Sequence, residues 1–377
     1  MRINTNQKQH WETDFSPELE KALELIKNNA SISESDGSFL SREFQWLREC
    51  GALSIVLPGM MLDFQGSNTQ KLLGLLRKIG KANLSVGRLY EGHVNALYLI
   101  HLYANPLQKE RYYKGIFEEG NLFGIWNTQD NEGIHLKDYN GSCRIDGSKT
   151  FCSGASIVNH AIITGDFNQN GETGWQMCII NMNKIGPERI GKNSWRPLGM
   201  QATGSFKVNF TGVDIDQEDL LSSPGIYLKQ PHFSAGAIRF AAVHLGGAES
   251  ICEETIAYLR QLNRLDDPFQ SLRISRMMSS LTMAGLLLED SGQKFDNWSN
   301  DPSMSEALIN CANLTRVNIE DRCLEIMEDS NRCVGARGLM KPGSLERNFR
   351  DLSFYLRQPA PDVTRVNIGK YYLQKSH

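Results

Sequence analysis

The chain has 377 residues, of which 40% are hydrophobic and 22% charged, and its formal net charge is −3. This composition is ordinary for a soluble globular protein, and the length predicts two or three packed units rather than one core. Because no long basic run is present, the sequence lacks the electrostatic signature of nucleic-acid binding and of membrane-surface binding.

Eight cysteines are scattered through apolar positions without a CxxC pair. This spacing predicts reduced, buried thiols of a cytoplasmic protein rather than a disulfide framework or a metal site. The polar stretch 1–15 has no apolar centre, and no apolar run reaches about 18 residues. We therefore predict no signal peptide, no membrane segment and a cytoplasmic location.

Residues 1–120 are predicted to form a helical domain. Ser16, followed by a proline and an acid, can cap the first helix, and apolar residues then recur at helical spacing. The same periodicity predicts helices over 41–50, around 72–79 and over about 85–104.

Residues 121–222 are predicted to form a β domain, because glycines punctuate the segment about every ten residues. The turn Gly199–Gly204 precedes an alternating strand, and its sequence is Gly-Met-Gln-Ala-Thr-Gly. Four segments have the apolar pattern of strands: 122–126, 160–164, 176–181 and 206–210.

In residues 223–377 the helical period returns, which predicts a C-terminal four-helix bundle domain. The first helix begins near 232 and is crowded with small residues, which allow another helix or a ligand to approach closely. The other helices are expected over about 269–297, 304–331 and 345–358, the last with a continuation after 362.

A helical block, a small β domain and a helical bundle thus follow one another, and their order and motifs resemble the acyl-CoA dehydrogenase family of flavoproteins over nearly the whole chain. Arg347, Arg350 and Asp351 match the family's Arg-x-x-Arg-Asp motif, which is mainly structural there. The resemblance implies a multidomain α+β fold: an N-terminal helical domain, a middle β-sandwich or barrel, and a C-terminal four-helix bundle. It also implies FAD between the β domain and the bundle, in a homodimer or homotetramer.

The resemblance implies two flavin-contacting segments in the β domain. The run that ends in Trp126-Asn-Thr128 is similar to the first of them, in which the threonine contacts the flavin. Phe151 and Ser153 are similar to the aromatic and hydroxyl residues of the second. A flat apolar ring covers the flavin edge, and a hydroxyl that reaches N5 or O4 tunes the electron affinity of the ring.

For the FAD pyrophosphate, the family uses an Arg and a downstream Gln from a neighbouring subunit. Arg264 and Gln270 are the nearest matches, with Arg273 or Arg276 as alternatives. The family also brings a glycine turn to the adenosine phosphates, where backbone N–H groups meet phosphate oxygens. The residues similar to that turn, which also fit a plain connection between helices, are Gly335, Ala336 and Gly338.

Dehydrogenation of an acyl thioester needs a carboxylate that removes the α proton while the flavin takes the β hydride. The family position for this Glu holds Pro359, and the alternative position, before Arg239, holds Ile238. Because these side chains cannot accept a proton, another base is required. Asp362 and His93 are the candidates, the first close to the usual position and the second on a helix that borders the flavin pocket in the family.

Each candidate base also has a structural interpretation. Asp362 after a proline fits a helix N-cap. His93, like His244 on the first bundle helix, fits a core histidine with satisfied hydrogen bonds.

Three functions follow from these residues and the resemblance. The first is an FAD-dependent oxidoreductase that oxidises the Cα–Cβ bond of an acyl thioester on CoA or an acyl carrier protein, with a non-standard base and an electron-transfer partner. The alternative is a flavin-dependent monooxygenase or oxidase on the same fold, which needs no carboxylate at the α-proton position. The third is a catalytically silent relative that binds a ligand.

Overall fold

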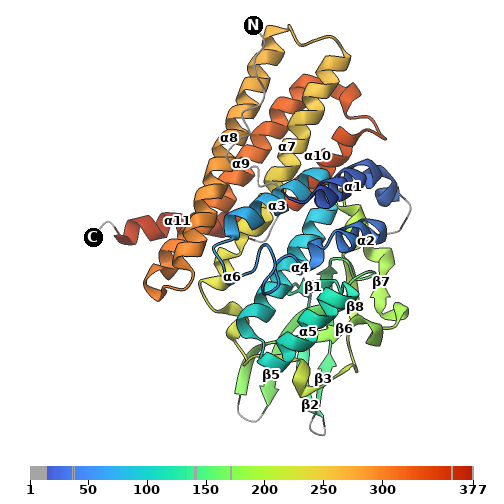
Figure 1. Ribbon diagram of the computed structural model, residues 1–377, viewed down its shortest axis with the longest axis vertical. Helices are drawn as coiled ribbons and strands as arrows, with labels where there is room; N and C mark the ends of the chain where they lie inside the picture. Colours follow the sequence, from blue (N-terminus) through green and yellow to red (C-terminus); the bar gives the residue numbers. More distant parts are fainter. Residues whose placement is uncertain are drawn as a thin grey trace.

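The computed structural model describes residues 15–35, 37, 39–131, 133–139, 142–169, 172–357 and 360–375. The long C-terminal helices form one end of the molecule, the β-sheets form the other, and the N-terminal helices pack against both (Figure 1). A continuous apolar core joins the three parts. The predicted multidomain α+β fold is therefore confirmed; the division at 120 and 222 stays a prediction.

The N-terminal part contains five helices in its described residues, one more than predicted. The extra helix, α5, begins at a capping box: the Asn105 side chain accepts from the Gln108 backbone N–H, and the Gln108 side chain accepts from the Asn105 backbone N–H. The helices are α1 (Pro17–Ser35), α2 (Ser41–Glu49), α3 (Thr69–Ala82), α4 (Leu84–Tyr103) and α5 (Pro106–Glu119).

The middle part folds into two sheets. In the larger one the strand order is β10-β6-β5-β2-β3-β9, and β1 pairs in parallel with β5, with Phe123 opposite His160. The smaller one has the order β4-β8-β7 and is irregular between Lys149 and Cys152. The strands are β1 (Phe123–Trp126), β2 (His135–Tyr139), β3 (Ser142–Asp146), β4 (Ser148–Cys152), β5 (His160–Gln169), β6 (Glu172–Asn181), β7 (Ile190–Gly191), β8 (Phe206–Asn209), β9 (Asp214–Ile215) and β10 (Leu220–Leu221).

The C-terminal part contains three long helices and shorter ones that pack across them. The helix predicted over 304–331 continues to Gly338, and the helix predicted over 345–358 ends at Tyr355. The helices are α6 (His232–Ala235), α7 (Ala237–Gln261), α8 (Pro268–Trp298), α9 (Ser305–Gly338), α10 (Ser344–Tyr355) and α11 (Pro361–Lys375). Within the described residues, no helix is both long and apolar enough to span a bilayer.

The small residue Gly246, in the middle of α7, serves helix packing. A Cβ added at Gly246 would lie 2.0 Å from the backbone oxygen of Arg77 in α3, so only glycine permits this crossing. Seven of the eight cysteines are buried, Cys50 is half-buried, and all eight are free thiols.

Candidate functional site

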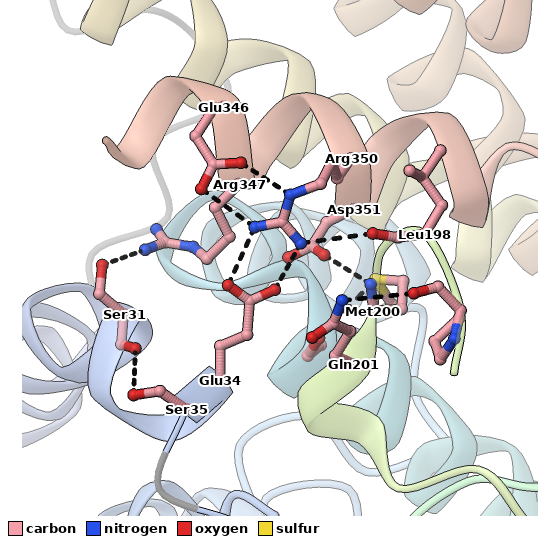
Figure 2. Close-up of polar contacts among 12 residues, drawn as sticks. Ser31, Glu34, Ser35, Leu198, Met200, Gln201, Glu346, Arg347, Arg350 and Asp351 are labelled. Atoms are coloured by element: carbon pink, nitrogen blue, oxygen red, sulfur yellow. Dashed lines mark hydrogen bonds and ion pairs between the residues drawn. The ribbon is translucent and has the colours of Figure 1, made fainter. Parts of the chain in front are cut away.

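Helix α10 is joined to α1 by an ion pair and to the β domain by hydrogen bonds (Figure 2). Arg350 donates two hydrogen bonds to Glu34 of α1, at 2.6 and 2.9 Å, and two to Glu346, at 2.7 and 3.1 Å. Arg347 donates to the hydroxyl of Ser31 at 2.7 Å. These four contacts to carboxylates make Arg350 a fully compensated charge.

The same helix holds the Gly199–Gly204 turn. The buried Asp351 carboxylate accepts a hydrogen bond from the backbone N–H of Met200, and Figure 2 shows this contact beside Arg350. Burial raises the pKa of Asp351 to about 6. A Cβ added at Gly199 would lie 2.1 Å from the Arg350 backbone oxygen, so the turn lies in backbone contact with α10.

Beyond this contact, three aromatic rings connect β4 to α10. Phe151 and Phe354 each meet Trp195 edge to face, with ring centroids 6.0 Å apart. Phe151 lies in the irregular part of β4, has φ of 54° and is 54% exposed. A large side chain held exposed at a left-handed backbone position is unusual and marks a candidate functional residue.

Ser153, two residues after Phe151, starts a chain of three hydroxyls. Thr203 Oγ1 donates to the carbonyl of Met200 at 2.7 Å, and this use of its hydrogen requires Ser205 Oγ, 2.8 Å away, to donate to Thr203. Ser153 Oγ, 2.9 Å from Ser205 Oγ, must then donate to Ser205. Ser153 therefore keeps only lone pairs for any further partner.

The other predicted flavin residues of the β domain differ in position. Thr128 is exposed, and its backbone oxygen accepts from the N–H of Thr150, which places it beside β4. Trp126 is 2% exposed, and its indole N–H donates to the backbone oxygen of Ser153 at 3.1 Å. Trp126 therefore positions the Ser153 backbone from within the core.

Buried Lys149 fixes the segment that carries Thr128. Its Nζ donates to the Asn127 backbone oxygen at 3.0 Å, the Gln129 Oε1 atom at 2.7 Å and the Thr164 Oγ1 atom at 3.3 Å. Burial lowers the pKa of Lys149 to about 8. Three acceptors match its three N–H donors, so the ammonium form is fully satisfied.

A cavity of about 720 Å³ lies between α4, the α6–α7 region, α9 and α11. It adjoins the Ser153 region, because Ile125 lines both the cavity and a small hollow that includes Ser153. A larger hollow of about 1010 Å³ between α1, α3, α7 and α8 contains none of the predicted site residues. The apolar and aromatic wall of the first cavity includes Tyr98, Leu99, Ile125, Tyr227, Phe233 and Phe240.

A row of polar side chains from α4 and α7 borders this cavity. Glu91 is 3% exposed and accepts from Arg88 Nη1 at 2.8 Å and from the Asn95 amide. The Asn95 oxygen in turn accepts from Arg239 Nε of α7. Both oxygens of Glu91 are thus engaged, and Arg239 meets an amide rather than a carboxylate.

The geometry argues against His93 as a proton donor. The ring is 1% exposed, Nδ1 accepts from the Phe123 backbone N–H at 3.0 Å, and Nε2 lies 2.9 Å from the Leu53 backbone oxygen. Because Nδ1 accepts, the single ring proton lies on Nε2 and is donated to Leu53. Burial lowers the pKa of His93 to about 4, so it stays neutral and holds β1 against α4.

Asp362 is also unsuited to act as a base in the cavity. It lies exposed in the first turn of α11, and the Thr364 N–H bonds to the Ala360 backbone oxygen, so the helix starts without an Asp362 cap. The α11 residues that line the cavity are Thr364, Asn367, Lys370, Tyr371 and Gln374. Asp362 lies on the opposite face from Thr364, because two residues span about 200° of helix. The usual base position, Pro359, is outside the described residues.

The predicted pyrophosphate residues lie at the end of the bundle farthest from the sheets (Figure 1). Arg264 pairs with Asp267 at 3.4 Å, and buried Gln270 accepts from Arg273 at 3.2 Å. The alternative Arg276 pairs with Asp329 of α9 at 3.2 Å. The predicted glycine turn is instead the last part of α9, in which only Gly335 leaves helical geometry, with φ 59° and ψ −171°, before Ala336 and Gly338. None of these residues lines the 720 Å³ cavity or the small hollow at Ser153.

Residues 238–355 match the family model described as "Acyl-CoA dehydrogenase, C-terminal domain". The resemblance to the acyl-CoA dehydrogenase family is confirmed. The described residues contain no cluster of three His, Cys, Asp or Glu that could hold a metal ion.

The acyl-CoA dehydrogenase-like chain is similar along its length to flavin monooxygenases. It is 23% identical to the probable FMNH2-dependent monooxygenase SfnC of Pseudomonas putida, over 95% of each protein. It is 22% identical to the dibenzothiophene monooxygenase of Mycolicibacterium goodii, over 95% of this chain and 94% of that one. Among solved structures, TdsC from Paenibacillus sp. A11-2 with FMN and indole has a TM-score of 0.85 at 18% identity, covering 95% of this chain and 96% of TdsC.

Sequence reasoning missed several residues of this site. Ser205, Thr203 and Trp195 lie in the mid-chain stretch whose glycines and alternation stand out, but nothing local shows that the hydroxyls meet Ser153. Glu91 and Asn95 lie one helical turn apart on α4, a spacing that places them on one face. The sequence therefore indicates the pairing of Glu91 with Asn95. It does not indicate the contact of Asn95 with Arg239, because Arg239 lies on α7.

Proposed function

We propose that this chain is a reduced-flavin-dependent monooxygenase that binds FMN beside Phe151 and Ser153 and oxygenates a small organic molecule held in the adjoining cavity. When bound, reduced FMN supplies two electrons and two protons to O2, so that one oxygen atom joins the substrate and the other leaves as water. The exposed aromatic ring and hydroxyl at β4 fit a flat ring with polar edges. This function replaces the expected FAD-dependent Cα–Cβ dehydrogenation as our preferred interpretation.

The observation that carries the proposal is the direction of the hydroxyl chain. Ser153 donates to Ser205, and it therefore offers an acceptor lone pair to a ligand. A reduced flavin carries a hydrogen on N5, and the oxidised flavin carries only a lone pair there. An acceptor at Ser153 is complementary to the reduced form, which is the form that a monooxygenase binds before O2.

The carboxylates support the same choice. The two family positions for the base hold Pro359 and Ile238. Of the described carboxylates that line the cavity, Glu91 is engaged through both oxygens and Glu306 is exposed. Removal of an α proton would therefore lack a free buried base, whereas oxygen transfer does not require one.

Anaerobic titration of the purified protein with reduced FMN, oxidised FMN and reduced FAD tests the proposal. We expect reduced FMN to bind most tightly, by about tenfold or more over oxidised FMN, as the gain or loss of one buried hydrogen bond implies. Ser205→Ala should narrow this ratio, because Ser153 regains its hydrogen, and Ser194→Ala, a surface serine of the same domain, should leave it unchanged. Anaerobic bleaching of bound flavin by an acyl-CoA would instead establish the dehydrogenase.

We further propose that the protein works as a homodimer or homotetramer. The support is an exposed apolar stripe on α8, in which Phe269, Leu272, Met283 and Leu286 are 68%, 59%, 51% and 56% exposed. A second copy covering it would bring its own bundle end, with Arg264 and Gln270, within reach of a neighbour. Light scattering on the eluted protein decides this, since a monomer at micromolar concentration would contradict the proposal.

A further inference from the structure

Arg239 is a buried cation whose described contacts are all neutral. The residue is 6% exposed, Nε donates to the Asn95 oxygen, and the guanidinium lies 4.8 Å from the ring centre of Tyr98 and 6.0 Å from that of Phe295. The nearby carboxylate, Glu91, is already paired with Arg88. Burial accordingly lowers the pKa of Arg239.

The carboxylates on the other side of Arg239 accept hydrogen bonds from backbone N–H groups instead of pairing with the arginine. Arg239 also lines a second hollow, of about 430 Å³, whose walls include Asp63 and Asp296. Asp63 accepts from the backbone N–H groups of Gly59 and Gln65, and Asp296 accepts from that of Thr69. No described carboxylate forms an ion pair with Arg239.

Burying a guanidinium without a counter-charge is costly, and proteins keep such a group where a ligand supplies the missing charge. Arg239 lines the 720 Å³ cavity together with Gly236 and Ala237, which begin the 25-residue helix α7. Gly236 provides no side-chain cap, so the partial positive charge of the helix start adds to that of Arg239.

The other charged side chains that line the cavity also favour an anionic ligand. Arg316 of α9 lies 5.3 Å from the ring centre of Phe240 and donates to Thr364 at 3.2 Å; burial lowers its pKa, and Glu320 of the same helix partly offsets that lowering. Lys370 and Glu306 lie exposed at the rim. With Glu91 neutralised by Arg88, the lining holds three cationic side chains and one acidic one.

We infer that Arg239 binds an oxyanion on the substrate, so that the proposed monooxygenase acts on small organic acids with an apolar or aromatic body and a carboxylate, sulfinate or sulfonate head. The inference rests on the proposed function for the reaction but not for the binding. The aromatic wall from Tyr98 to Phe240 receives the body, and the forked N–H donors of Arg239 receive the head. Arg316 lies on a facing wall and adds to the positive potential.

Calorimetric binding of benzenesulfonate and of its neutral analogue benzenesulfonamide tests the inference without turnover. We expect the FMN-loaded wild-type protein to bind the sulfonate about tenfold or more tightly than the sulfonamide. The Arg239→Gln substitution should weaken the affinity for the sulfonate at least about thirtyfold and leave the affinity for the sulfonamide unchanged. Arg332→Gln, an exposed arginine on α9, is the matched control and should change neither affinity. Equal binding of both probes by the wild type would overturn the inference.

A second source of the oxyanion is the phosphate of FMN itself, and the comparison of FMN with riboflavin separates the two. If Arg239 holds the substrate head, Arg239→Gln leaves the ratio of FMN to riboflavin affinity unchanged; if that ratio collapses, the arginine serves the cofactor and the inference is wrong. Should Arg239→Gln not fold, Arg316→Gln must weaken sulfonate binding with sulfonamide binding intact. Failure of the wild type to bind flavin would refute the proposed function, and the two probes would then be compared on the flavin-free protein to test the role of Arg239.

Discussion

Two arginines in this molecule, Arg350 and Arg239, have opposite surroundings. Arg350 lies between Glu34 and Glu346, with four hydrogen bonds to carboxylate oxygens. Arg239 is more deeply buried, yet its described contacts are an amide and two aromatic rings. Carboxylates of the chain neutralise the charge of Arg350, whereas no described carboxylate forms an ion pair with Arg239.

This difference separates structural arginines from binding arginines on physical grounds. A charge compensated inside the chain stabilises the native state because its removal leaves partners unpaired. An uncompensated buried charge costs stability, and its presence calls for a ligand. The following substitutions test this distinction, from the largest expected effect to the smallest.

Arg350→Gln should cause the largest loss of stability, about 3 kcal/mol in the free energy of unfolding, because two shielded carboxylates lose their counter-charge. Urea unfolding followed by circular dichroism measures it. Arg332→Gln removes a pair with Glu328 that is 63% and 57% exposed, and should cost less than about 0.5 kcal/mol. Equal losses in the two variants would show that the α10 network contributes no more than a surface pair.

Gly199→Ala should destabilise by about 2 kcal/mol, because the new methyl group would overlap the Arg350 backbone and push the turn away from α10. Thermal unfolding measures the loss. Gly369→Ala is the matched control: its Cβ meets nothing within 4 Å, and alanine favours helix α11, so stability should stay equal or rise by up to about 1 kcal/mol.

Asp351 should make stability depend on pH. Its folded pKa of about 6 exceeds the unfolded value of about 3.9, so the folded state binds more protons between these limits and loses stability as pH rises through that window. Relative to the wild type, Asp351→Asn should therefore gain about 1–3 kcal/mol between pH 4.5 and pH 7.5, because asparagine never ionises.

Because the wild type and Asp351→Asn share all other titrating groups, the difference between their unfolding free energies reports Asp351 alone. The buried histidines His93 and His244, with pKa values lowered to about 4 and about 3 by burial, make both proteins more stable as pH rises through the range below 6.5. Their contribution cancels in the difference. A difference between the unfolding free energies that stays constant with pH would rule out titration of Asp351.

Arg239→Gln should have the smallest effect on the ligand-free protein, within about 1 kcal/mol of the wild type or more stable, because glutamine still donates to Asn95 and no buried charge remains. Differential scanning calorimetry measures this. A loss as large as that of Arg350→Gln would place Arg239 among the structural arginines and remove the contrast between the two sites.

Much of the architecture could be predicted from local pattern. Helical spacing around 72–79 and over 85–104 gave α3 and α4, and the glycine-punctuated segment gave the sheets. Helix α5 was missed because its capping box, Asn105 and Gln108, precedes a weakly periodic segment. The motif order gave the resemblance to the acyl-CoA dehydrogenase family, but the preferred first function, acyl-thioester dehydrogenation, is less well supported than the monooxygenase alternative.

The candidate site was predicted less completely. Thr128 lies beside β4 through its backbone contact with Thr150, and Trp126 turns into the core to meet the Ser153 backbone; flavin contact by these residues stays a prediction. His93 forms hydrogen bonds with two backbone groups from distant segments, Leu53 and Phe123, which no spacing along α4 indicates. Asp362 is exposed and does not line the cavity, and the exact start of α11, which decides which way it faces, could not be read from the sequence.

The sequence by itself determined which residues are apolar, where helices and strands alternate, and that no carboxylate stands at the expected base positions, because these properties depend on neighbours along the chain. Only the tertiary structure decided which charges are compensated and which way the hydroxyl hydrogens point. The surroundings of Arg239 depend on Asn95, which lies 144 residues away along the chain, and the hydroxyl chain depends on the contact of Ser153 with Ser205, 52 residues away. Electrostatic compensation is a property of the assembled interior, and it distinguishes Arg239 from Arg350.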